Sequence, residues 1–120
     1  MPKILLFVLC GFYFVSCSTT TLDKAKKLYE NAIEQCNNWN EEDWHTFLLE
    51  TSKLDCEFFS SNPSEKDVEE YICFGGSFED YLDQHTHEKE LYQRAALLAD
   101  PELERLAGKA RNAMHAWFRR

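Results

Sequence analysis

Apolar residues recur every three or four positions along nearly the whole chain after residue 21. The segment 22–36 illustrates the spacing with Leu22, Ala25, Tyr29, Ala32 and Cys36. Such spacing places apolar side chains on one face of an α-helix, whereas a half-buried strand requires strict alternation. No alternating stretch of four or more residues competes with it. The pattern therefore predicts a chain of helices, each with one face to bury.

Turn and cap residues divide this pattern into five predicted helices. The predicted boundaries are a turn at 37–40, a stop at 60–63, a glycine pair at 75–76 and an Asp-Pro pair at 100–101. Asn40, Ser64, Ser77 and Asp100 are residue types that cap helix starts. Gly75–Gly76 is predicted to end the third helix, because glycine readily takes the left-handed conformation that closes helices.

Helices with apolar faces and short polar connections predict an all-α fold. We expect a small antiparallel bundle of about four to five helices in one domain, 22–120. Aromatic residues on the predicted inner faces are expected to fill much of the core: Tyr29, Trp44, Phe47, Phe58, Tyr71, Phe78, Tyr81, Tyr92 and Trp117.

The N-terminal segment has a different character. Twelve nearly unbroken apolar residues, Ile4–Val15, follow Lys3 and lead into Ser16-Cys17. A membrane-spanning helix needs roughly 20 apolar residues, so this run is typical of the core of a secretory signal. Two alternatives are cleavage near Ser18 to release a free protein, and an uncleaved helix buried in the fold.

The sequence Phe14-Val15-Ser16-Cys17 resembles the signal of bacterial lipoproteins, in which the cysteine becomes the lipid-bearing first residue. Phe14 stands where that family usually has leucine. The resemblance implies a signal peptide at 1–16, a lipid anchor with fatty-acyl chains such as palmitate on Cys17, and a polar tether at 17–21. The opening of the domain, 22–32, is similar to small helical lipoproteins of the Bacteroides type, which implies an outer-membrane location in a Gram-negative envelope.

The charge balance is acidic. The chain has 13 Lys and Arg against 21 Asp and Glu, a net charge of −8. Loss of residues 1–16 would remove only Lys3 and leave −9. This balance opposes nonspecific binding to nucleic acid, which relies on basic residues at phosphates. It also opposes docking onto anionic lipid head groups by charge.

The cysteines leave two arrangements open. Beyond Cys10 in the leader and Cys17, the chain has Cys36, Cys56 and Cys73. An exported protein can form disulfides, so a Cys56–Cys73 bridge or no bridge are both compatible with the sequence. Their spacing matches no zinc template. Cys36 falls on an apolar stripe and is predicted to lie in the core.

Motifs for catalysis and metal binding each lack a required residue. The zinc-protease helix motif that His87-Glu88 begins needs a second histidine at the position of Leu91. Asp83, His85, His87 and Glu88 are ligand types, but on a helix residues two apart point about 160° away from each other. We expect His85 to face the core and His87 the solvent, with no catalytic residue, metal site or cofactor.

The sequence thus predicts a non-enzymatic envelope lipoprotein that binds an unidentified envelope protein through an exposed helix face. One alternative is a periplasmic inhibitor or immunity protein whose acidity complements a basic toxin or enzyme. The other is a metal-assisted hydrolase that uses Asp83, His85 and His87.

Overall fold

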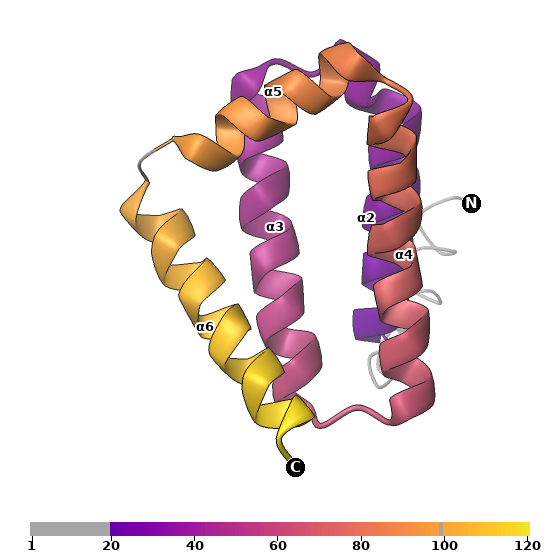
Figure 1. Cartoon of the computed structure of the whole chain (residues 1–120), viewed down its shortest axis with the longest axis vertical. Helices are drawn as coiled ribbons and strands as arrows, with labels where there is room; N and C mark the ends of the chain where they lie inside the picture. Colours follow the sequence, from indigo (N-terminus) through magenta and orange to yellow (C-terminus); the bar gives the residue numbers. More distant parts are fainter. Residues whose placement is uncertain (1–19, 99) are drawn as a thin grey trace, which may run out of the picture.

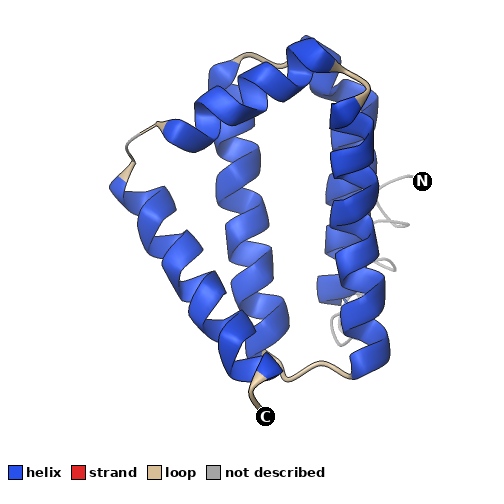
Figure 2. Ribbon diagram, viewed as in Figure 1, coloured by secondary structure: helices blue, strands red, loops and turns tan. Residues whose placement is uncertain are grey.

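The computed structural model describes residues 20–98 and 100–120, which form helices joined by short loops. In chain order these are α2 (Thr20–Gln35), the short 3-10 helix η2 (Cys36–Asn38), α3 (Glu41–Ser60), α4 (Glu65–Asp83), α5 (Thr86–Leu97) and α6 (Pro101–Phe118). This part of the chain contains no strand (Figure 2). The predicted all-α bundle is confirmed.

The helices form two pairs with α5 across one end (Figure 1). α3 packs most extensively on α6, α2 packs on α4, and α5 contacts both α3 and α4. Neighbours in sequence, α2 with α3 and α3 with α4, run in opposite directions, as short connections require. Within the two pairs, however, the helices run parallel, because α5 carries the chain across the end of the bundle before α6 begins.

Three of the predicted caps form as expected. At the start of α3, the Asn40 side chain accepts a hydrogen bond from the Asp43 N–H at 2.9 Å, and the Asp43 carboxylate accepts one from the Asn40 N–H at 3.1 Å. The side chains of Ser64 and Asp100 likewise accept backbone N–H groups in the first turns of α4 and α6, and Pro101 opens α6. These bonds satisfy N–H groups that the helix itself leaves unpaired.

The predicted helix end at Gly75–Gly76 and the predicted cap at Ser77 are wrong, because α4 continues to Asp83. Neither glycine has a positive φ. A Cβ added at Gly75 would lie 3.7 Å from the Tyr29 hydroxyl of α2. This distance is an ordinary van der Waals contact, so α2 packs directly on this side of α4. The packing of the pair offsets the cost of glycine within a helix, about 1 kcal/mol.

The break falls instead at Gln84 and His85. Their backbone N–H groups donate to the carbonyls of Tyr81 and Leu82, which tightens the last turn of α4. His85 then leaves the helical region, with φ −132° and ψ 80°. The predicted fourth helix, 78–99, is therefore divided between the end of α4 and α5, and this turn directs α5 across the bundle.

Two apolar clusters make up the core. Nearest α5, the first contains the buried residues Ala32, Cys36, Trp44, Phe47, Phe78, Leu82 and Ala95. The second lies toward the opposite end and contains Ala25, Leu54, Phe58, Phe59, Val68 and Tyr71. Phe58 and Tyr71 stack with ring centroids 4.0 Å apart. The nine aromatic residues predicted to be inside are all buried or packed against these clusters.

Phe59 is a core residue that lies outside the apolar stripe predicted for this helix. That predicted stripe consists of Trp44, Phe47, Leu48, Thr51, Leu54 and Phe58. It is 5% exposed and packs against Trp117 and Phe118 of α6. α3 has partners on two sides, with α2 on one and α6 on the other. A single-stripe interpretation of α3 therefore misses the second buried face.

Candidate functional site

Cys17, with the predicted signal peptide at 1–16 and the start of the tether, lies outside the described residues. The other predicted cysteine sites are described. Cys56 of α3 is half-buried and Cys73 of α4 is exposed, and both are free thiols, so the Cys56–Cys73 bridge is not formed. Cys36 is 1% exposed in the core, as predicted, and burial raises the pKa of its thiol.

The ligand-type residues around His85 are engaged separately. Asp83 accepts a hydrogen bond from the Lys89 ammonium at 2.7 Å. A His85 ring nitrogen contacts the Tyr81 carbonyl at 2.7 Å, and its ring stacks on Tyr81. His87 is exposed, as predicted. No three His, Cys, Asp or Glu residues gather around a metal-sized space in the described part of the chain.

His45 and Asp100 form a contact that the sequence did not indicate. The His45 imidazole is bonded to the Asp100 carboxylate, which joins α3 to the start of α6. Partial desolvation raises the pKa of Asp100, but the hydrogen bonds from the Glu102 N–H and from His45 outweigh it and hold that pKa below its usual range.

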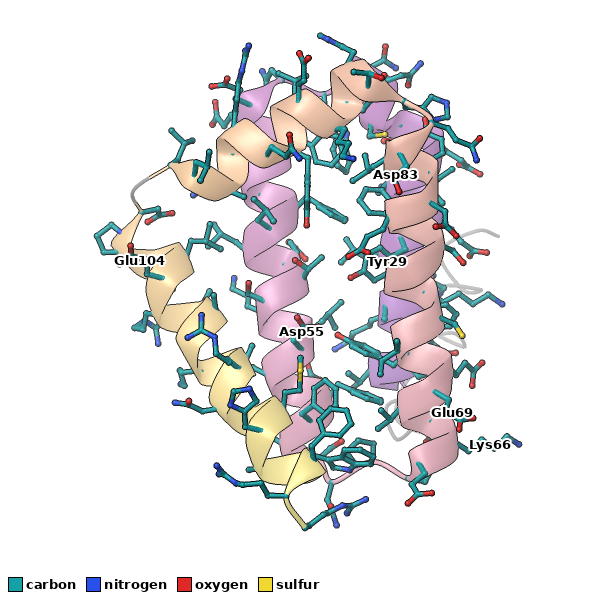
Figure 3. All side chains as sticks on the ribbon, viewed as in Figure 1. Tyr29, Asp55, Lys66, Glu69, Asp83 and Glu104 are labelled. Carbon is teal, nitrogen blue, oxygen red and sulfur yellow. The ribbon has the colours of Figure 1, made fainter. Side chains whose placement is uncertain are left out.

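Asp55 of α3 lies among phenol groups between the two helix pairs (Figure 3). Tyr71 donates a hydrogen bond to its carboxylate at 2.5 Å. Burial raises the pKa of Asp55, and the bond from Tyr71 opposes this only in part. Burial and the nearby Asp55 carboxylate raise the pKa values of Tyr29 and Tyr71 far above the usual range, so both phenols stay neutral. The hydrogen bond between Tyr71 and Asp55 joins α4 to α3.

Among the residues that the structure describes, four large apolar side chains are exposed, and they lie in two grooves. Ile72 is 53% exposed and Phe118 55%, while Leu97 is 85% exposed and Leu98 48%. The sequence pattern places Ile72 with Val68 and Tyr71 on the apolar face of the third predicted helix, and this prediction is wrong for Ile72. Leu97 and Leu98 lie outside the apolar stripes predicted from the sequence. This position off the stripes was the sequence signal that indicated a surface role.

The first groove, here called the α4–α6 groove, lies between the start of α4 and the end of α6. It has a volume of about 390 Å³ and is lined by Glu65, Val68, Glu69, Ile72, Trp117, Phe118 and Arg120. Arg120 is engaged within the fold, because it bonds to Asn62 and the Pro63 carbonyl and lies over the Trp117 ring. Glu65 and Glu69 make no ion pair within the described residues.

The second, here called the α5–α6 groove, lies where the end of α5 meets α3 and α6. It has a volume of about 660 Å³ and is lined by Leu48, Ser52, Ala96, Leu97, Leu98, Leu103, Glu104, Ala107 and Arg111. Figure 3 shows Glu104 near the start of α6.

The two grooves differ in charge pattern. α4 carries seven Asp and Glu and a single Lys, and that base, Lys66, points outward away from the bundle (Figure 3). α6 carries two Glu and three Lys and Arg. The α4–α6 groove is therefore lined by two acids from α4 and by Arg120, which is engaged within the fold, whereas the α5–α6 groove is lined by one acid and one base, both from α6.

Comparison with protein-family models, curated proteins and solved structures finds no match to this chain. Within residues 20–98 and 100–120, none of the helices has both the length and the apolar character needed to cross a membrane.

Proposed function

We propose that this chain is a non-enzymatic, membrane-tethered protein-binding module that takes a basic partner in the α4–α6 groove. The observation that carries the proposal is the combination of exposed apolar and acidic side chains in one groove. Ile72 and Phe118 are each more than half exposed there, beside Glu65 and Glu69.

The chemistry of the groove specifies the partner. Apolar side chains that a partner would bury supply affinity, and the surrounding charges select which partner approaches. Seven of the eight charged residues of α4 are acidic. A second copy that presented the same face would therefore meet like charge. Nucleic acid and anionic lipid are disfavoured for the same reason. A partner with an apolar side chain flanked by Lys or Arg is complementary to this surface.

The tether is the second part of the proposal. We place the lipid on Cys17 and the domain in the envelope of a Gram-negative bacterium, at the outer membrane. Two or more acyl chains would anchor the protein stably despite its net negative charge. The support is the resemblance of Phe14–Cys17 to a lipoprotein signal and the 12-residue apolar run before it.

A periplasmic inhibitor or immunity protein is the second candidate, and the same surface would serve it, because a basic toxin or enzyme would present the complementary charge. The metal-assisted hydrolase receives less support, since Lys89 engages Asp83 and the Tyr81 carbonyl engages His85. Metal content of the purified protein tests that alternative.

Cross-linking from the groove in intact cells tests the proposal. A photoreactive amino acid at position 72 in the full chain should form an adduct with one constant partner that has a basic surface. Reversal of the two groove charges, Glu65→Lys with Glu69→Lys, should lower the yield of that adduct by about tenfold.

The matched control reverses two exposed acids on α2, Glu30→Lys with Glu34→Lys, which changes the net charge equally. It should leave the adduct nearly unchanged. Equal loss in both variants would mean that net charge alone attracts the partner, and absence of an adduct from position 72 would contradict binding in this groove.

A further inference from the structure

The α5–α6 groove is a partly apolar feature of the described surface that the proposed function does not use. Leu97 and Leu98, at the end of α5, lie beside it and are 85% and 48% exposed. Leaving large apolar side chains in water is unfavourable, and such a patch with a polar rim is typical of a protein contact. The remaining lining residues indicate what covers it.

Two charged side chains in this groove have no partner in the described structure. The side chains of Glu104 and Arg111, both on α6, take part in no ion pair or hydrogen bond there. Other charged residues nearby are paired: Arg105 bonds to Glu102, and Arg94 lies 3.7 Å from Glu41. The groove therefore presents one unpaired charge of each sign.

Glu104 and Arg111 lie on the same face of α6. They are seven positions apart, which is close to two helical turns and about 10 Å along the helix axis at a rise of 1.5 Å per residue. If two copies of α6 pack antiparallel about a two-fold axis, residue 104 of each copy faces residue 111 of the other when the axis passes between residues 107 and 108. One contact then forms two Glu104–Arg111 pairs.

The residues at that axis permit close approach. Ala107 lines the groove, and a Cβ added at Gly108 would meet nothing within 4 Å. Helix axes pack 8–10 Å apart depending on the side chains between them, and small residues allow the shorter distance. The exposed leucines stand beside this face, where a second α6 would cover them.

We propose that the α5–α6 groove is a two-fold symmetric contact between two copies of this chain, with Glu104 of each copy paired to Arg111 of the other. The surface is self-complementary in the way that a two-fold interface requires. The acidic α4 face lacks this property, so dimer formation leaves the α4–α6 groove to a different partner.

Cysteine cross-linking in cells that produce the full chain tests the contact. Because Cys73 is exposed, the parent for all variants carries Cys73→Ser. Gly108→Cys places a thiol next to the expected axis, and a short thiol-to-thiol bismaleimide should link two copies. Lys109→Cys is the matched control, since position 109 is exposed on α6 one residue away and points off this face.

The expected result is a dimer band for Gly108→Cys well above that of the parent and of Lys109→Cys. Adding Arg111→Glu should lower the dimer association constant by about tenfold, because each Glu104 would then face an acid. Adding Glu104→Arg as well should restore the band, since the pairs re-form with their signs exchanged.

Equal bands from positions 108 and 109, or no band above the parent, would overturn the proposal. So would a double variant that stays as weak as Arg111→Glu alone while circular dichroism shows it folded. A normal dimer with no adduct from position 72 would uphold this contact and contradict the proposed function, so the two tests fail independently.

Discussion

At the scale of single residues, two aspartates show how the environment of a carboxyl group raises or lowers its pKa. Asp55 lies between the helix pairs, and burial raises its pKa although Tyr71 donates a hydrogen bond to it. Asp100 caps α6, and the bonds from the Glu102 N–H and His45 outweigh desolvation and lower its pKa. The bond from the Glu102 N–H is local to the Asp100 cap, whereas the bond from His45 and the burial of Asp55 depend on groups distant in sequence.

These two pKa shifts make the stability of the folded protein depend on pH in opposite directions. A raised pKa means that the ionised form of Asp55 opposes folding; the cost is absent below the ordinary value of 3.8 and grows as the pH rises through the folded-state pKa. Asp55→Asn should therefore stabilise the protein at pH 7 by about 1 kcal/mol, a few degrees in Tm. The gain should disappear below the ordinary pKa, as thermal melts across pH would show.

Asp100→Asn is the informative contrast, because asparagine also caps helices well. The lowered pKa of Asp100 contributes stability above the ordinary value of 3.8 that is lost as the pH falls through the folded-state pKa. Its substitution should lower Tm at pH 7 and have no effect at strongly acid pH. The prediction for Asp55 would be contradicted if Asp55→Asn were less stable than the wild type at pH 7, because the Asp55 charge would then be favourable where it lies.

At the scale of elements, α4 shows how packing overrides a local signal. Gly75–Gly76 followed by Ser77 predicts a helix end and a new start, yet α4 passes through them. The side of α4 that bears Gly75 lies against Tyr29 of α2. The break moves to Gln84–His85, where no glycine or proline marks it.

Gly76→Ala tests the continuity of α4. A Cβ at position 76 would meet no atom within 4 Å, and the residue has no positive φ. Alanine should stabilise the helix by about 0.5–1 kcal/mol, measured by urea unfolding with an unchanged m-value. If Gly76 instead closed a helix in the left-handed conformation, alanine would destabilise the protein.

At the scale of the whole molecule, the acidic α4 and the end of α6 belong to different helix pairs, yet both line the α4–α6 groove. Helix order and the crossing of α5 place the α5–α6 groove elsewhere, where α5 meets α3 and α6. We propose a basic partner for the first groove and a second copy for the other. A tethered bundle with both surfaces could hold two partners at the membrane.

Mass spectrometry of the mature N-terminus tests the tether. The wild-type protein should begin at Cys17 with acyl chains attached, and Cys17→Ala should remain unprocessed at this site and carry no lipid. Fractionation should recover the wild type with membranes. An unmodified wild-type N-terminus at another residue would contradict the lipoprotein assignment.

The sequence by itself determined the helical class, the caps at Asn40, Ser64 and Asp100, and the burial of Cys36 and most core aromatics. Those features depend on residues within one or two helix turns. Only the tertiary structure decided that Phe59 is buried, that Ile72 is exposed, and that Glu104 and Arg111 share a groove with Leu97 and Leu98. The physical reason is that periodicity identifies an apolar face, but whether a helix has one neighbour or two, and where a face ends uncovered, depends on how all the helices pack.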